Sequence, residues 1–213
     1  MRKILSLAFL CLLTAGCVSS TQPLSSGDRG GLTGKTIAMT TRGSPAFLAM
    51  TAGKGMFAVA GVAVAAASGN ELVRNNNIAD PTEAIAQGVA AAYGAAYDMQ
   101  VVEPVNTVST SDISAIVKAS GGANYVLDVA SLGWGYSYLG FNFNQFRVGY
   151  TVNMRVIDAS TGKVISTDSC IYDPKKMGKP AVSHDELLAD GAAYIKKELA
   201  DATRLCVQKF SPK

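Results

Sequence analysis

Cys17 is the first residue with clear chemistry, because it ends the run LTAGC (residues 13–17) near the start of the chain. Two basic residues and an apolar stretch, residues 4–13, come before this run, and the stretch is too short to span a bilayer. Small residues directly before a cysteine are typical of a bacterial lipoprotein cleavage site. The pattern predicts that residues 1–16 are a signal peptide and that diacylglycerol is attached to the Cys17 thiol. The alternative is an ordinary signal peptide with Cys17 as a spare thiol.

The predicted lipid places the mature chain at a membrane. Each buried CH₂ contributes about 0.8 kcal/mol and a single chain anchors only marginally, so two or three acyl chains, palmitate included, are expected to hold the protein durably. Val18 follows the cysteine, where an aspartate would resemble an inner-membrane retention signal. We therefore expect an outer-membrane protein whose domain faces the periplasm.

Two further cysteines, Cys170 and Cys206, remain after Cys11 leaves with the signal peptide and Cys17 is acylated. Two thiols in an oxidising compartment usually pair, so we predict a disulfide between them. A zinc site is the alternative, but only His184 could join the two cysteines, and a tetrahedral site needs four ligands. No metal is therefore expected.

Charge and motifs exclude several functions. Removal of residues 1–16 lowers the formal charge from +3 to +1, which leaves no polybasic surface for nucleic acid. The chain contains no G-x-S-x-G, H-E-x-x-H or P-loop sequence. His184 lies in the helix-start sequence SHDE, and adjacent residues on a helix do not form a catalytic triad. We expect a solvated His184, no cofactor and no enzymatic activity, although a pair of carboxylates for sugar cleavage cannot be picked out by sequence.

Aromatic residues are concentrated in residues 133–146 (GWGYSYLGFNFNQF), which hold the only tryptophan of the chain. The glycines and asparagines among them predict a loop. Such a loop either folds over the core or offers its rings to a partner, because Trp and Tyr bring large contact area at low entropic cost. Both interpretations stay open, and the candidate partner-binding residues are Trp134, Tyr136, Tyr138, Phe141 and Phe143.

The remaining chain predicts elements that would position these residues. Apolar and polar residues alternate from Phe146 to Val156, which favours an antiparallel sheet with one open face. Asp80, Pro81 and Glu83 form a helix start, as do Ser183 and Glu186. The predicted strands are residues 35–40, 99–103, 125–132, 145–158 and 164–172, and the predicted helices are 80–97, 111–120 and 183–207.

The fold class predicted from these elements is α/β (α+β), with a mixed, largely antiparallel sheet and helices packed on one face. One domain is expected over residues 34–210, since 197 mature residues suit a single domain with a tail. The last helix carries Cys206 on its apolar stripe, facing the sheet that carries Cys170. Residues 17–33, rich in Ser, Thr and Gly, are expected to be a flexible tether with a reach of about 20–25 Å.

Ala46 to Gly69 is nearly all Ala, Gly, Val, Met and Phe, and its uncharged run is too short for a transmembrane helix. Its small residues would allow close helix packing. One interpretation is a helix buried within the domain or against a partner subunit. The others are membrane contact or a pore lining.

The order of elements, with the hairpin turn Asp158-Ala-Ser-Thr-Gly-Lys-Val164, resembles a periplasmic α/β fold. It is similar to the fold of the curli secretion lipoprotein, the TolB N-terminal domain and the lipoprotein activators of penicillin-binding proteins. The short tether departs from a synthase activator, and the chain lacks the paired amphipathic hairpins of the curli lipoprotein, so the resemblance implies a fold and no particular activity.

Two hypotheses for function follow. The first is a non-enzymatic outer-membrane lipoprotein that binds or scaffolds other envelope proteins. The second is a ring- or pore-forming export accessory that uses Ala46–Gly69 for oligomerisation or membrane contact. A third class, an envelope hydrolase, has no motif to support it.

Overall fold

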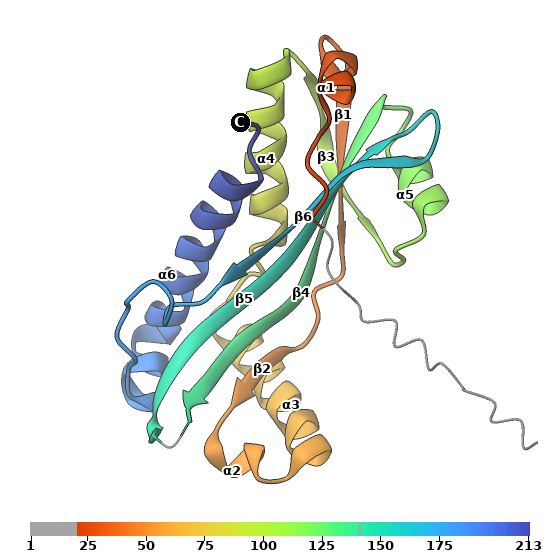
Figure 1. The fold of residues 1–213 in the computed structure, drawn as a ribbon. Helices are drawn as coiled ribbons and strands as arrows, with labels where there is room; N and C mark the ends of the chain where they lie inside the picture. The colour runs from red at the N-terminus through yellow and green to blue at the C-terminus, as the bar shows by residue number, and fades with distance from the viewer. Residues whose placement is uncertain (1–20, 141) are drawn as a thin grey trace, which may run out of the picture.

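The computed structural model describes residues 21–140 and 142–213 (Figure 1). Cys17, the predicted signal peptide and Phe141 lie outside these ranges. The strands are β1 (Thr36–Arg42), β2 (Phe47–Met50), β3 (Gln100–Val108), β4 (Tyr125–Leu139), β5 (Asn142–Asp158) and β6 (Lys163–Tyr172). The helices are α1 (Ser26–Leu32), α2 (Ala52–Gly55), α3 (Ala58–Asn76), α4 (Thr82–Tyr97), α5 (Ile113–Ala119) and α6 (His184–Phe210).

All six strands belong to one mixed sheet, in the order β3-β1-β4-β5-β6 with β2 beside β4. Strand β1 is parallel to both β3 and β4, whereas β4, β5 and β6 form long antiparallel ladders. Strands β1 and β2 pair with β4 one after the other: β1 pairs with residues 125–129 and β2 with residues 134–137. The predicted fold class is confirmed.

The two faces of the sheet are covered unequally (Figure 1). The alternating residues from Phe146 to Val156 face α4 and α6 and form the main core with them. On the opposite face, Ile116 of α5 packs against Val126 and Ile157 and covers only one end of the sheet. At the other end, α2 and the start of α3 lie next to β2, and the central strands there keep an open face.

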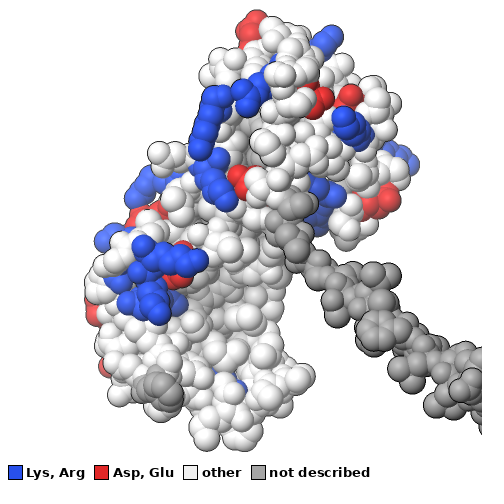
Figure 2. Space-filling view, viewed as in Figure 1, with Lys and Arg blue, Asp and Glu red and all other residues white. Residues whose placement is uncertain are grey.

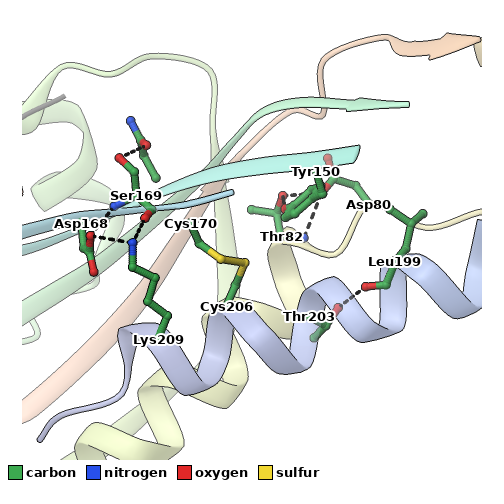
Figure 3. Close-up of a disulfide and its surroundings, with 11 residues drawn as sticks. Asp80, Thr82, Tyr150, Asp168, Ser169, Cys170, Leu199, Thr203, Cys206 and Lys209 are labelled. Atoms are coloured by element: carbon green, nitrogen blue, oxygen red, sulfur yellow. Dashed lines mark hydrogen bonds and ion pairs between the residues drawn. A yellow bond between two sulfur atoms is a disulfide. The ribbon is translucent and has the colours of Figure 1, made fainter. Parts of the chain in front are cut away.

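The predicted disulfide is confirmed. Cys170 of β6 and Cys206 of α6 are bonded, with their Cα atoms 5.6 Å apart, and both residues are buried (Figure 3). Helix α6 begins at the predicted Ser183 cap, whose side chain accepts a hydrogen bond from the Glu186 amide. Residues 189–192 break its helical geometry, which the sequence pattern did not predict. The bond therefore clamps the second part of α6 to the edge strand.

The predicted tether is wrong for residues 21–33. Gln22 and Thr167 exchange two backbone hydrogen bonds, of 2.8 and 3.0 Å, so the chain is already paired with β6 at this point. Ser25 then caps α1, and Leu32 at its end is fully buried in the core. A polar sequence with only two leucines is typical of a linker, but here Leu32 is buried in the core and Leu24 packs against it. The folded domain begins by residue 21.

Candidate interaction surface

Helix α3 buries its smallest residues. Gly61, Ala65 and Gly69, spaced four apart on one side of the helix, are its buried positions. A Cβ added to Gly61 would lie 1.7 Å from the Lys54 carbonyl oxygen, and one added to Gly69 would lie 1.8 Å from the Phe47 carbonyl oxygen. Only glycine allows such an approach, so α3 packs backbone to backbone against α2 and β2.

The large apolar residues of this region are exposed. Met56 is 83 % exposed, Phe57 70 % and Val59 85 %, and Val62 and Val64 also face outward. No charged residue occurs from position 55 to position 67. We call residues 52–67 the apolar lobe. Figure 2 shows that the end of the molecule where β2, α2 and α3 lie is almost free of charged side chains.

The one cation of the lobe is used internally. The Lys54 ammonium donates a hydrogen bond of 2.9 Å to the Ala49 carbonyl, and partial burial lowers its pKa below the ordinary value. The lobe therefore carries one cation, held at its base by the Ala49 carbonyl, and its residues 55–67 are uncharged.

These positions correct the sequence interpretation of Ala46–Gly69. Residues 47–50 form a strand, and residues 55–64 are exposed apart from Gly61, so a helix buried within the domain is wrong for most of the segment. Burial against a partner subunit and contact with a membrane stay open. The prediction of close packing through small residues is confirmed, with β2 and α2 as the neighbours.

A groove of about 670 Å³ lies on the open face of the sheet, next to the lobe. It is lined mainly by apolar residues of β2, β4, β5 and β6, among which Leu132 and Ile171 are 55 % and 61 % exposed. We call this hollow the sheet groove. Its residues include Leu48, Met50, Leu132, Ile171, Arg147 and the glycines 133, 135 and 149.

Two of the groove glycines are not required by the packing of the chain itself. At Gly135, an added Cβ would lie 2.3 Å from the Leu48 carbonyl oxygen, so β2 requires a glycine there. At Gly133 nothing lies within 4 Å of such an atom, and at Gly149 the nearest atom is the Tyr172 carbonyl oxygen at 4.0 Å. Glycine weakens a strand and often marks the close approach of another backbone or a ligand. The floor of the groove is open to such an approach.

The aromatic segment is mostly core. Strand β4 extends through it to Leu139, so the predicted loop is wrong and the residues form a long hairpin with β5. Trp134 and Tyr136 are each 5 % exposed, and Phe47 packs edge-on against both rings. The Trp134 indole also donates to the Pro45 carbonyl at 2.8 Å. The partner-binding interpretation is therefore wrong for these two residues.

The other aromatic candidates lie toward the hairpin tip. Tyr138 is half-buried, and its hydroxyl oxygen lies 2.5 Å from the position that a Cβ on Gly55 would occupy, so the hairpin contacts the lobe. Phe143 is 54 % exposed and its ring lies 5.7 Å from that of Tyr138. Phe141 lies outside the described residues. Phe143 adds to the exposed apolar surface of this end.

His184 is not the solvated residue that we expected. Its ring lies 5.2 Å from that of Phe146 and 5.9 Å from that of Tyr136, and its Nε2 is 3.3 Å from the Tyr136 hydroxyl. Burial raises the pKa of Tyr136 above its ordinary value. These contacts make His184 part of the packing at the start of α6.

The buried charged groups are joined in clusters. Asp128, 1 % exposed, accepts hydrogen bonds from Arg42 and Arg155, both at 2.7 Å. Lys179 donates to Glu198 at 2.8 Å and to Asp201 at 2.5 Å. In this way each of these carboxylates is paired, which is the usual condition for burying a charge.

A third cluster joins α4 to the sheet. Asp80 accepts a hydrogen bond from the Tyr150 hydroxyl at 3.2 Å and another from the Thr82 amide at 2.9 Å (Figure 3). Burial, and then the nearby Asp80 carboxylate, raise the pKa of Tyr150. Asp80 therefore bonds the first residue of α4 and Tyr150 of β5, while Pro81 takes the cap position predicted for Asp80.

Within residues 21–140 and 142–213, no three His, Cys, Asp or Glu side chains come together as metal ligands. No helix in the same ranges has the length and apolar character needed to cross a membrane. Among the described residues, the apolar lobe and the sheet groove are therefore the candidate surfaces for binding other molecules.

Sequence reasoning missed the groove and the orientation of the lobe. The groove is assembled from β2, β4, β5 and β6, so no local signal marks it. The lobe had a signal, since the four-residue spacing of Gly61, Ala65 and Gly69 is a packing stripe. The valines off that stripe could have been assigned to the outer face.

Comparisons with known proteins give only distant matches. No protein-family model and no curated protein sequence matches the chain. Among solved structures, the PelC dodecamer from Paraburkholderia phytofirmans is 16 % identical, with 91 % of this chain and 93 % of that one covered and a TM-score of 0.37. Protein XCC0632 from Xanthomonas campestris is 12 % identical, with coverages of 84 % and 85 % and a TM-score of 0.41.

The lipoprotein GNA1162 from Neisseria meningitidis is 15 % identical, with 78 % of this chain and 99 % of that one covered and a TM-score of 0.28. Similarity at this level assigns neither a family nor an activity.

Proposed function

We propose that this chain is a lipid-anchored, non-enzymatic protein of the bacterial envelope that binds and assembles other envelope proteins at the outer membrane. The observation that carries the proposal is the apolar lobe, whose Met56, Phe57 and Val59 are all at least 70 % exposed. Large contiguous apolar surfaces are uncommon on monomeric soluble proteins and mark interaction sites. The lobe adjoins the sheet groove, so the two form one docking region.

The attachment of Gln22 to β6 supports a position close to the membrane. The chain from Cys17 to Thr21 spans at most about 14 Å when fully extended. The Thr21 side chain also bonds Asp168 of β6, at 3.3 Å. A lipid on Cys17 would hold this edge of the sheet near the bilayer surface, with much less freedom than a tether extending to residue 33. Partners at or in the same membrane would then be favoured.

Site-specific photocrosslinking in cells tests the proposal. A photoreactive amino acid at position 59 should capture envelope proteins, further copies of this chain included, which mass spectrometry would identify. The matched control is position 118, where the exposed Lys118 lies on α5 at the other end of the sheet. Equal capture at both positions, or none at position 59, would contradict the proposal.

The anchor is tested separately. Intact mass of the detergent-extracted protein should show the loss of residues 1–16 and the addition of acyl chains at Cys17. A Cys17→Ala variant should lose membrane association while its domain folds normally. An unmodified Cys17 in the native protein would refute the lipid anchor without affecting the role of the lobe.

A second candidate function is an export accessory that assembles as a ring from copies of this chain. One observation favours it: an exposed apolar lobe and a hollow groove lined mainly by apolar residues occur on the same molecule. Size measurement of the detergent-extracted protein separates the two candidates, since a large ring supports export and a monomer contradicts it.

A further inference from the structure

We infer that the apolar lobe of one copy of this chain docks into the sheet groove of a second copy. The inference rests on the proposed role of the lobe as a docking surface, and it names the occupant of the groove. It does not depend on the lipid anchor or on a particular cellular process.

The first argument comes from the floor of the groove. Gly133 and Gly149 place no side chain over the sheet, although nothing in the chain would clash with one. Glycine inside a strand costs roughly 0.5–1 kcal/mol relative to alanine. A second backbone lying close against the strands gives these glycines a role. Small residues on that second backbone would allow the closest approach.

The second argument comes from the composition of the lobe. Apart from Met56 and Phe57, residues 55–67 are only Gly, Ala and Val, so a helix of this composition has a thin profile. Residues 55–67 of the lobe are uncharged, while the groove is a hollow lined mainly by apolar side chains, with Arg147 and Asp173 also in its wall. Docking would cover Val59 and Leu132 together without burying a charge from the lobe.

The third argument separates a second copy from a bilayer. Helices that lie in a membrane interface carry Lys and Arg on their polar side. The lobe has only Lys54, whose ammonium is bonded to Ala49. A bilayer would also leave the glycine floor of the groove unexplained, whereas a second copy accounts for both surfaces at once.

Symmetry then limits the assembly. The lobe and the groove are different surfaces. If the lobe of each copy binds the groove of the next copy around an axis, a ring forms, and if two copies each place their lobe in the other's groove, a dimer forms. Both assemblies contain the same contact. The molecular mass of the assembly gives the number of copies.

Paired cysteines test the contact directly. One full-length copy carries Val59→Cys and a differently tagged full-length copy carries Leu132→Cys, both at exposed positions. Oxidation of the detergent-extracted mixture should give a covalent dimer that contains both tags. The control replaces the second variant with Lys118→Cys, which should give none. Absence of the mixed dimer, or equal yield with the control, would overturn the inference.

Two substitutions test the lobe–groove contact through the molecular mass of the detergent-extracted protein. Val59→Asp should reduce the assembly to monomers, while Lys118→Gln, which changes the net charge equally, should leave it intact. Gly133→Val should also give monomers, because it fills the groove where the chain has free space. The circular dichroism spectrum at room temperature should stay unchanged for all three, which separates loss of docking from loss of folding.

Other results would identify a different occupant. A wild-type monomer whose unlipidated form binds phosphatidylethanolamine–phosphatidylglycerol vesicles through Val59 would overturn the inference in favour of a membrane. Capture of a foreign protein at position 59, with no mixed dimer, would overturn it and leave the proposed function standing.

Discussion

Helices α6 and α3 both pack against the same sheet, but they use their apolar residues in opposite ways. Helix α6 buries its large residues, Leu187, Ile195, Leu199 and Phe210 among them, and Cys206 bonds it to β6. The only fully buried residues of helix α3 are glycine and alanine, and Leu72 and Val73 near its end pack partly against the core. The valines near its start, Val59, Val62 and Val64, are exposed. The apolar surface of α6 is used up within the chain. That of α3 remains available, which marks α6 as structural and α3 as the surface for other molecules.

The two helices are also held by different forces. A disulfide and the buried Lys179–Glu198 pair attach α6. Close backbone packing and the hydrogen bond from the Phe47 amide to Asn70 attach α3. Changes to these attachments should therefore affect different parts of the molecule.

The largest effect is expected from removing the disulfide. Replacing Cys170 and Cys206 together by alanine should lower the free energy of unfolding by about 4 kcal/mol, from the entropy of closing a loop of this length. Chemical denaturation would measure it, and reduction of the wild-type protein should reproduce the loss. Protease cleavage within α3 should not increase in native buffer, because α6 and not α3 is clamped. A loss below about 1 kcal/mol would show that packing alone holds α6.

The next effect concerns the charge partner of α6. Lys179→Met should destabilise the fold by about 3 kcal/mol, because Glu198 is 2 % exposed and would lose its cation. The control is Arg204→Met, whose side chain is 74 % exposed and should contribute less than about 1 kcal/mol. Equal effects of the two substitutions would contradict the buried pairing.

The cluster of Lys179, Glu198 and Asp201 also predicts that stability depends on pH in the acid range. Hydrogen bonding from Lys179 lowers the pKa of Asp201 below its ordinary value of 3.8, while burial opposes the shift. A folded pKa below the unfolded one contributes stability above pH 3.8, and this contribution is lost as the pH falls through the folded pKa. The destabilisation by Asp201→Asn at pH 7 should therefore shrink below about pH 4 in denaturation curves. A difference that is constant down to about pH 2 would argue against the shift.

A smaller and local loss of stability is expected where α3 packs against β2. Gly69→Ala would place a Cβ 1.8 Å from the Phe47 carbonyl oxygen, so α3 must shift, at a cost of about 1–3 kcal/mol. Limited proteolysis should show faster cleavage of residues 51–76. The control Gly30→Ala meets no atom within 4 Å and should be neutral or slightly stabilising. Unchanged proteolysis would mean that α3 is held by other contacts.

The smallest effect is expected on the exposed face of the same helix. Val59→Ser should change stability by less than about 0.5 kcal/mol, because the side chain is 85 % exposed. The comparable Val89→Ser in α4, at a fully buried valine, should cost several times more. If Val59→Ser were also costly in the isolated monomer, the lobe would be part of the core.

Sequence reasoning succeeded where the pattern is local. The alternation from Phe146 to Val156 predicted β5 and its buried face, the Ser183 cap lies at the start of α6, and the helix predicted over residues 111–120 is present as α5. Sequence reasoning failed where pairing with a strand distant in the sequence determines the local structure. Residues 133–139 look like a loop because of their glycines, but pairing with β2 and β5 on both sides makes them a strand.

The functional region was identified only in part. The sequence singled out Ala46–Gly69 and the aromatic segment, and of the aromatic candidates that are described only Phe143 is largely exposed. Trp134 is buried because Phe47 and the Pro45 carbonyl meet it from another strand. A large aromatic ring in the sequence indicates that the residue can make extensive contacts, but not whether those contacts come from the same chain or from a partner.

By itself the sequence determined the strand and helix periods, the pairing of Cys170 with Cys206 and the uncharged run that begins at Gly55, because each follows from residue types and their spacing. Only the tertiary structure decided which side of α3 is buried. Every side of that helix is apolar near its start, so hydrophobicity could not orient it. The contacts of Gly61 and Gly69 with neighbouring backbone oriented it instead, and Val59, Val62 and Val64 were left exposed.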